Sequence, residues 1–149
     1  MRHSLTRDLP YAPGDLFDLV ADVEAYPQFV RWVSELTVSD RRDEADGVTV
    51  LDARAAVRFS IISERFASRV RLDRPGLSID VSLLSGPFRT LENHWRFYPR
   101  GRRTEIRFDI DVEFRSRVLT AFLAANVGYA ASRLVRGCEE RAAQLYGRH

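Results

Sequence analysis

The residues best placed for acid–base chemistry are three carboxylates in the second half of the sequence. Asp109, Asp111 and Glu113 would share one face of a strand, where neighbouring carboxylates can exchange protons with a substrate. Arg107 falls on the same face, and every second residue between these positions is apolar. Such alternation is typical of an antiparallel sheet with one face in water. We therefore interpret the carboxylates as a solvated sheet surface and not as a catalytic site.

Nucleophilic and metal-binding side chains are scattered along the chain. The histidines, His3, His94 and His149, are far apart, and Cys138 has no cysteine or histidine nearby, so no metal-binding spacing is present. His94 falls on the polar side of a strand beside Trp95, where we expect an exposed residue and not a general base. We expect Cys138 to be a small core residue. Because the chain also lacks a glycine-rich phosphate loop and a Gly-x-Ser-x-Gly elbow, we predict that it is not an enzyme and needs no metal or cofactor.

The composition is that of one domain spanning residues 1–149. Hydrophobic residues make up 45% of the chain, and no run approaches the roughly 18 apolar residues of a membrane span. The sequence begins directly with patterned residues, so we expect no signal peptide. A single cysteine excludes an internal disulfide and agrees with a reducing compartment. We expect a cytoplasmic location, extending to peripheral contact at the inner membrane.

The charges are nearly balanced. The 23 basic residues, all of them arginine, stand against 21 acidic residues, which gives a net charge of +2. Most arginines are interleaved with Asp and Glu, as on a solvated mixed-charge surface. Because nucleic-acid affinity depends on neutralising phosphates, this balance is weak for an RNA-binding protein and argues against DNA as a partner.

Hydrophobic periodicity predicts a strand, two short helical segments and then a series of strands. The first strand covers residues 2–9, and a helix follows from Pro13, which suits a first helical turn. A hairpin is predicted at the polar run 40–47. Alternation then places Ile61 on the inward face, and a turn or bulge is predicted near residues 62–63, where inward and outward positions exchange.

A long helix is predicted at the end of the chain. The clearest strand, residues 104–114, is followed after Ser116 by apolar residues at spacings of three and four up to about Tyr146. Such a helix would be ~45 Å long. Because only this helix is long enough to cover the sheet, the order predicts an α+β fold in which a curved antiparallel sheet wraps around the C-terminal helix.

Small and amide side chains on the inward faces raise the question of a cavity. Ala53 and Ala55 lie on the inward side of a strand, and several alanines and glycines crowd the long helix. Small residues of this kind either permit close packing or leave a cavity. Asn93 and Asn126 also fall on inward or near-inward positions, and buried amides need partners. A cavity holding water or a polar ligand would supply those partners.

Four segments carry a resemblance to a known family. They are "YAPGDLFDLVADVEAYPQFVRW" (11–32), "ERFASRV" (64–70), "GPFRTLENHWRF" (86–97) and "DIDVEFRSRVLTAFLAANV" (109–127). Together these segments resemble the coenzyme-Q-binding branch of the START-like, polyketide-cyclase-related superfamily. The segments are spread over nearly the whole chain.

The resemblance implies a helix-grip (START-like) fold with a hydrophobic tunnel between the sheet and the C-terminal helix. It implies that ubiquinone or another polyprenyl lipid is bound there without catalysis, in support of respiratory electron transport. The same branch includes ribosome-association toxins, so binding to the large ribosomal subunit is the alternative, and a polyketide-cyclase-like enzyme is the third. For the ribosome alternative the candidate residues are Arg65, Arg69 and Arg71, with Arg100, Arg102 and Arg103 in a turn.

The inward positions give a candidate lining for the tunnel. It comprises Ala53, Ala55, Phe59, Phe66, Val81, Phe88, Leu91, Asn93, Trp95, Leu123, Asn126 and Val127. A second cluster, Tyr26, Phe29 and Trp32, either forms the tunnel mouth or packs in the core. Because ligand pockets usually hold ~300–1,000 Å³, we predict that the headgroup and the first isoprene units are bound while the distal tail stays outside.

Overall fold

The structure, a computed structural model, describes residues 1–147 and contains seven strands, one 3-10 helix and two α-helices. In chain order these elements are β1 (Arg2–Leu9), α1 (Pro13–Ala21), η1 (Val23–Gln28), β2 (Val33–Ala45), β3 (Val48–Phe59), β4 (Ile62–Asp73), β5 (Ser78–Ser85), β6 (Phe88–Arg100), β7 (Arg103–Phe114) and α2 (Arg117–Tyr146). The predicted order of a strand, a helical pair, six strands and a long helix is confirmed.

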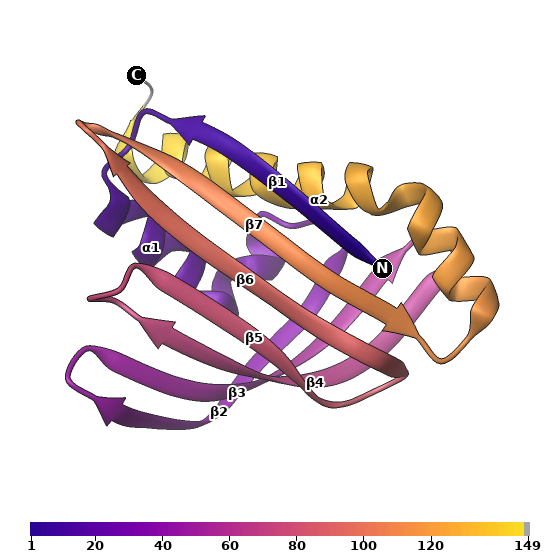
Figure 1. Ribbon diagram of the computed structural model, residues 1–149. Coiled ribbons are helices and arrows are strands. Elements are labelled where there is room, and N and C mark those ends of the chain that lie inside the picture. The colour runs from indigo at the N-terminus through magenta and orange to yellow at the C-terminus, as the bar shows by residue number, and fades with distance from the viewer. Residues whose placement is uncertain (148–149) are drawn as a thin grey trace.

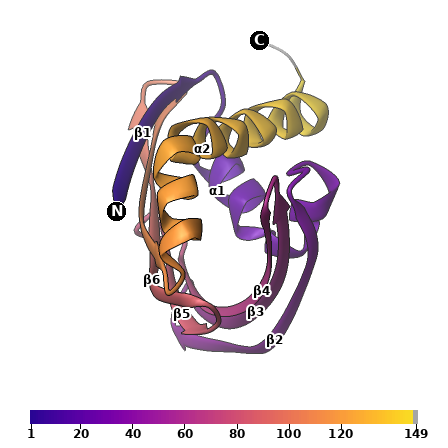
Figure 2. The ribbon, with the colours of Figure 1, turned by 90° about the vertical axis from the view of Figure 1, so that its right-hand side faces the viewer.

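All seven strands form one antiparallel sheet in the order β1-β7-β6-β5-β4-β3-β2. β1 pairs with the last strand, and Leu9 lies opposite Thr104. The sheet is strongly curved in Figure 1. Figure 2 shows its strands as a U whose open side is closed by α2. The predicted α+β fold, with a curved antiparallel sheet around a long C-terminal helix, is therefore confirmed.

The hairpin predicted at 40–47 is confirmed with a shorter turn, and the second predicted turn lies one or two residues earlier than expected. β2 continues through most of the polar run 40–47, and register shifts on either side of Arg42 accommodate the irregular residues, so only Asp46 and Gly47 form the turn. The next turn consists of Ser60 and Ile61 and not of residues 62–63, because Phe59 pairs directly with Ile62. Ile61 consequently projects into solvent instead of facing inward.

α1 covers part of the concave face of the sheet. Pro13 begins the helix, and Asp15 stands in its first turn, where the helix dipole favours a negative charge. Leu16 and Val20 are fully buried, and the helix packs against α2 and β6. This arrangement leaves one end of the U to be closed by α2 alone.

α2 consists of two halves with different environments. Ser116 caps its start by accepting a hydrogen bond from the backbone N–H of Leu119. Every fully buried residue of the helix lies at Ala131 or beyond. Figure 2 shows that the helix bends: its first half runs along the arm of the U that contains β6, and its second half runs across the open side. By length and composition alone α2 is apolar enough to cross a membrane. Polar residues interrupt its apolar sequence, so no continuous apolar run marks it.

The backbone angle and a close neighbour both favour glycine at position 86, the first residue of the segment "GPFRTLENHWRF". Its φ is +147°, and a Cβ at this position would lie 2.6 Å from the Cβ of Phe66. We expect Gly86→Ala to lower the free energy of unfolding by about 2–3 kcal/mol in urea denaturation, from backbone strain and this contact. Gly101→Ala is the control, because Gly101 also has a positive φ but nothing within 4 Å, and it should cost about 1 kcal/mol. Equal losses would show that the contact with Phe66 is unimportant.

Candidate ligand-binding cavity

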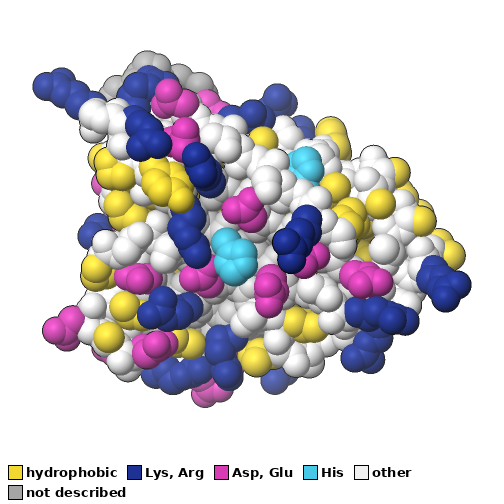
Figure 3. Space-filling view, in the orientation of Figure 1, with side chains coloured by type: hydrophobic (Ala, Val, Ile, Leu, Met, Phe, Trp, Pro, Cys, Tyr) yellow, Lys and Arg dark blue, Asp and Glu magenta, His cyan; other side chains and the backbone are white. Residues whose placement is uncertain are grey.

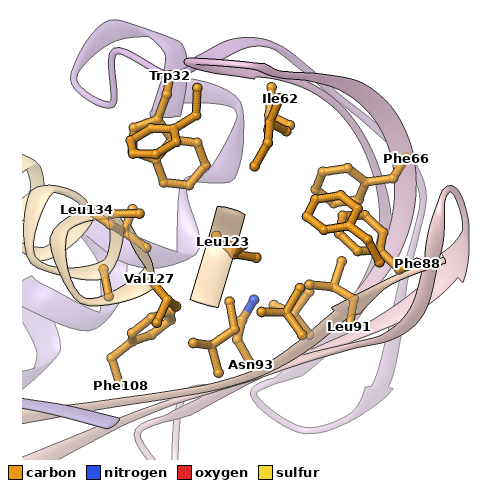
Figure 4. A pocket seen from close by; sticks show the side chains of 18 residues that line it. Trp32, Ile62, Phe66, Phe88, Leu91, Asn93, Phe108, Leu123, Val127 and Leu134 are labelled. Atoms are coloured by element: carbon orange, nitrogen blue, oxygen red, sulfur yellow. The ribbon is translucent and has the colours of Figure 1, made fainter. Parts of the chain in front are cut away.

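An apolar cavity of about 180 Å³ lies between the concave face of the sheet and α2. Its walls come from β3 to β7, from α2 and from Trp32, as Figure 4 shows from close by. Of the described residues that line it, Trp32 and Asn93 alone carry a nitrogen or oxygen atom in the side chain. The cavity is therefore suited to a hydrophobic molecule with very few polar groups.

Most of the predicted lining residues do face this cavity. They are Phe59, Phe66, Val81, Phe88, Leu91, Asn93, Leu123 and Val127, and they are joined by Trp32 from the predicted mouth cluster. The strand residues among them occupy inward positions of the two-residue alternation. The two helix residues belong to the apolar stripe of α2. The patterns that predicted the fold thus also placed these side chains at the cavity.

Four other residues of the predicted lining do not reach the cavity. Ala53 and Ala55 are buried on the inward side of β3, but neither lines the cavity wall. The ring of Trp95 packs in the core against Phe108, with ring centroids 4.6 Å apart. Asn126 donates a hydrogen bond of 2.7 Å to the backbone carbonyl of Phe122, so its amide is satisfied within its own helix.

Of the two alternatives for the second cluster, Tyr26 and Phe29 follow the one in which they pack against the core. The hydroxyl of Tyr26 donates to the carbonyl of Val20 at 2.7 Å, and burial raises the pKa of Tyr26 well above its usual value. The backbone of Phe29 approaches α2 so closely that a Cβ at Gly137 would lie 2.8 Å from the Phe29 carbonyl oxygen. Tyr26 and Phe29 therefore hold η1 and the following residues against α2 and do not form an entrance to the cavity.

Nine lining residues are absent from the lining predicted from the sequence. They are Val57, Ile62, Phe108, Ile110, Val112, Phe114, Ala130, Ala131 and Leu134. The signal for four of them was present in the inward alternation of β7, the clearest strand in the sequence. What the sequence did not reveal is how far the sheet curves, and this curvature decides which inward residues meet a cavity and which pack in the core.

Aromatic rings form one region of the cavity wall and pack behind another. Phe66 meets Phe88 edge-on at 5.2 Å, and Phe88 stacks on Phe114 at 4.6 Å. Near the first half of α2, the ring of Phe59 lies 6.2 Å from the rings of both Phe122 and Tyr129. Offset and edge-on rings of this kind form a suitable wall for a planar ring of a ligand.

Asn93 supplies the polar feature of the cavity. Its Oδ1 atom is buried and, within the described part of the chain, has no hydrogen-bond partner. Figure 4 shows the side chain directed into the cavity with its nitrogen at the tip. Because buried amide oxygens normally accept a hydrogen bond, this unpaired oxygen could accept one from a donor group of a ligand. The indole N–H of Trp32 is likewise buried without a partner among the described residues.

The remaining chemically active side chains lie away from the cavity. Burial raises the pKa of the Cys138 thiol to about 12, so the thiol is not a nucleophile at neutral pH. His94 alternates with Asn93 and faces outward, where its Nδ1 lies 2.6 Å from Asp80 and Arg96 lies 2.9 Å from the same carboxylate. Burial raises the pKa of Asp80, but these hydrogen bonds outweigh it and leave that pKa below its usual value. Among residues 1–147 no cluster of His, Cys, Asp or Glu could hold a metal ion.

The arginines of the outer sheet face are paired with carboxylates. Figure 3 shows basic and acidic side chains interleaved over the face formed by β1, β7 and β6. The pairs on the sheet and its turns include Arg65–Glu35 at 2.8 Å, Arg69–Asp52 at 3.1 Å, Arg71–Glu44 at 3.5 Å, Arg100–Glu105 at 3.5 Å and Arg103–Asp8 at 2.9 Å. Five of the six arginines considered for ribosome binding are thus engaged in ion pairs within the domain.

Comparison with known proteins gives one matching family model and several relatives. Residues 9–137 match the family described as polyketide cyclase / dehydrase and lipid transport. The ribosome association toxin RatA of Pseudomonas aeruginosa is 34% identical over 140 residues, covering 93% of both chains. The RatA of Rickettsia prowazekii is 31% identical over 144 residues, covering 94% of both chains. The mitochondrial coenzyme Q-binding protein coq10 of Schizosaccharomyces pombe is 28% identical, covering 92% of this chain and 84% of its own.

Two solved structures extend the comparison. An 18 kDa protein from Caulobacter crescentus is 49% identical with a TM-score of 0.85, covering 99% of both chains. The Zhui aromatase/cyclase from a Streptomyces strain has a TM-score of 0.81 at 17% identity, covering 100% of this chain and 99% of its own. At that identity the likeness shows the shared fold alone.

Proposed function

The chain belongs to the START-like polyketide cyclase / dehydrase and lipid transport family, and we propose that it is a non-catalytic carrier of ubiquinone or a related polyprenyl lipid. The observation that carries the proposal is an apolar cavity with the unpaired amide oxygen of Asn93 at its wall. The headgroup of a prenyl quinone has the matching chemistry, a planar ring whose hydroxyl groups, in the reduced quinol, can donate to that oxygen. The relative named as a coenzyme Q-binding protein supports the same ligand class.

The cavity volume limits how much of the ligand can be bound inside the protein. A cavity of roughly 150 Å³ is enough to hold one benzene ring, and the cavity here is about 180 Å³. The space therefore suits a headgroup, while the isoprene tail must leave along the wall or lie outside. Since a membrane solvates the tail about as well as a protein does, the headgroup contacts provide the selectivity.

Asn93 is the residue that we assign to the headgroup. Its amide N–H can donate to a quinone carbonyl, and its Oδ1 can accept from the hydroxyl of the reduced quinol. The bond from the quinol hydroxyl would satisfy Oδ1, the atom of this side chain that is buried without a partner among the described residues. Asn93 would thereby distinguish a quinone from a plain hydrocarbon.

Replacing Asn93 by leucine should have opposite effects on binding and on stability. We expect an approximately tenfold higher dissociation constant for a short-tailed ubiquinone in calorimetric titration, because one hydrogen bond is lost. The melting temperature of the free protein should rise, because an unsatisfied buried amide is removed. Asn126→Leu is the control, since the Asn126 amide already bonds to Phe122, and it should leave quinone affinity unchanged. Unchanged affinity in Asn93→Leu would contradict the assignment.

Ribosome association is the second candidate, and it is favoured by the names of the RatA relatives. Its surface would be the outer sheet face, where Arg65 and Arg69 would have to exchange their carboxylate partners for phosphates. Arg65→Glu combined with Arg69→Glu should spare quinone binding and weaken co-sedimentation with ribosomes. Co-sedimentation of the wild type should also fall steeply with added salt. A wild type that co-sediments with ribosomes and binds no quinone would favour this candidate over the carrier.

A further inference from the structure

Large hydrophobic side chains are exposed around the end of the domain where α2 closes the cavity. Ile61 in the β3–β4 turn is 59% exposed, Val118 at the start of α2 is 71% exposed and Tyr129 is 61% exposed. Tyr129 lies beside Phe59, only two residues from Ile61, with ring centroids 6.2 Å apart. We call Ile61, Val118 and Tyr129 the end patch. Figure 3 shows hydrophobic and basic side chains together at this right-hand end of the molecule.

The β3–β4 turn exposes an isoleucine against the usual preferences of turns. A two-residue hairpin turn with a positive φ at its first position favours glycine there and polar residues around it. Ser60 instead occupies that position with a φ of +54°, and Ile61 follows as the second turn residue. The flanking Phe59 and Ile62 both line the cavity. The turn thus places one apolar side chain outside, directly beside the wall of the cavity.

The first half of α2 is apolar on both of its faces. One face, which includes Leu123 and Val127, lines the cavity. The opposite face is exposed and runs from Val118 to Tyr129 through alanines, and residues 118–132 contain no charged side chain. A helix that is apolar all round is normally buried. Here one of the two apolar faces has no covering element among the described residues.

Exposed arginines without carboxylate partners surround the end patch. Within residues 1–147 no ion pair joins Arg58, Arg89, Arg115 or Arg117 to a carboxylate, although many arginines of the outer sheet face are paired. All four are exposed and lie within three residues of the cavity-lining Phe59, Phe88 or Phe114. Apolar side chains ringed by cations match an interface with acyl chains below and anionic headgroups around it.

We infer that the end patch and these four arginines dock the domain on the surface of a bilayer that contains anionic phospholipids. Docking would place the first half of α2 against the lipid, so a ligand could pass between bilayer and cavity without crossing water. The purpose of docking rests on the proposed carrier function, but docking itself needs no quinone. An RNA surface would use the arginines without the apolar residues, and a second copy of the chain would repel through its own arginines.

The test is co-sedimentation of the purified protein with vesicles that contain no quinone. Vesicles of phosphatidylcholine mixed with phosphatidylglycerol should bind the wild type at least about tenfold more tightly than phosphatidylcholine alone. Ile61→Asp combined with Val118→Asp should reduce this binding about tenfold or more, because two anchors become charged. Leu145→Asp is the matched control, since Leu145 is also exposed, at the far end of α2, and it should bind like the wild type.

The arginines are tested separately from the apolar anchors. The double variant Arg115→Glu, Arg117→Glu should lose the preference for phosphatidylglycerol. The control is the double variant Arg41→Glu, Arg102→Glu, which makes the same change of charge at the opposite end of the domain. The control should retain most of the preference. Circular dichroism checks the fold of each variant. Equal binding of the end-patch variant and Leu145→Asp would overturn the inference. So would salt-insensitive self-association of the wild type through the end patch. Quinone titration in solution is unaffected by docking, so the two proposals fail independently.

Discussion

Val127→Trp is expected to abolish quinone binding while leaving the domain folded. Val127 projects from α2 into the cavity (Figure 4), and the indole ring would occupy the space that we assign to the headgroup. Burying a six-carbon ring contributes roughly 5 kcal/mol at about 0.8 kcal/mol per carbon. Losing even half of this would raise the dissociation constant by about 100-fold. Calorimetric titration with a short-tailed ubiquinone measures the effect.

The same helix provides a matched control for this substitution. Val118→Trp introduces the same side chain on the exposed face of α2, away from the cavity, so its quinone affinity should equal that of the wild type. Near-wild-type circular dichroism and melting temperature are expected for both variants, because the cavity offers room for the ring of residue 127. If folded Val127→Trp binds quinone as tightly as Val118→Trp, the ligand does not occupy this cavity.

The largest effect on stability is expected from Val135→Asp. Val135 is 1% exposed in the second half of α2, where the helix packs on the core. An unpaired carboxylate there should lower the free energy of unfolding by at least about 4 kcal/mol. The melting temperature should therefore fall by more than about 10 °C, or the protein should not fold.

The two halves of α2 should respond differently to the same replacement. Leu123→Asp changes a half-buried residue at the cavity wall, so it should cost only about 1–2 kcal/mol of stability. Leu145→Asp, on the exposed part of the second half, should change stability by less than about 0.5 kcal/mol. Thermal denaturation of the three variants gives the ranking. An equal loss in Val135→Asp and Leu123→Asp would contradict the division of α2 into a packed half and a half that only closes the cavity.

The sequence predicted the fold more completely than it predicted the site. Period-two alternation in β7 and the helical stripe after Ser116 report local backbone geometry and burial, so the element order and the sheet-around-helix architecture follow from them. Whether an inward side chain meets a cavity depends on the curvature of the whole sheet. Ala53 and Asn93 both occupy inward positions, yet only Asn93 reaches the cavity.

Local patterns were also insufficient where the role of a residue depends on the exact backbone position of near neighbours. Asn126 was interpreted as a cavity residue because it lies near the apolar stripe, but its amide bonds to the carbonyl one turn earlier. Ile61 was placed inward because the turn position was off by one or two residues. A shift of one residue moves a strand side chain to the other face of the sheet, and this error concealed the exposure of Ile61.

The central claim is that the cavity holds the headgroup of a prenyl quinone, and the most direct test is to identify what the protein carries. Wild type and Val127→Trp are purified side by side without detergent, extracted with organic solvent and compared by mass spectrometry. The account predicts ubiquinone or a related polyprenyl lipid in the wild-type extract and its absence from the Val127→Trp extract. A wild type that yields no such lipid and does not bind added quinone, or a Val127→Trp protein that carries as much as the wild type, would contradict it.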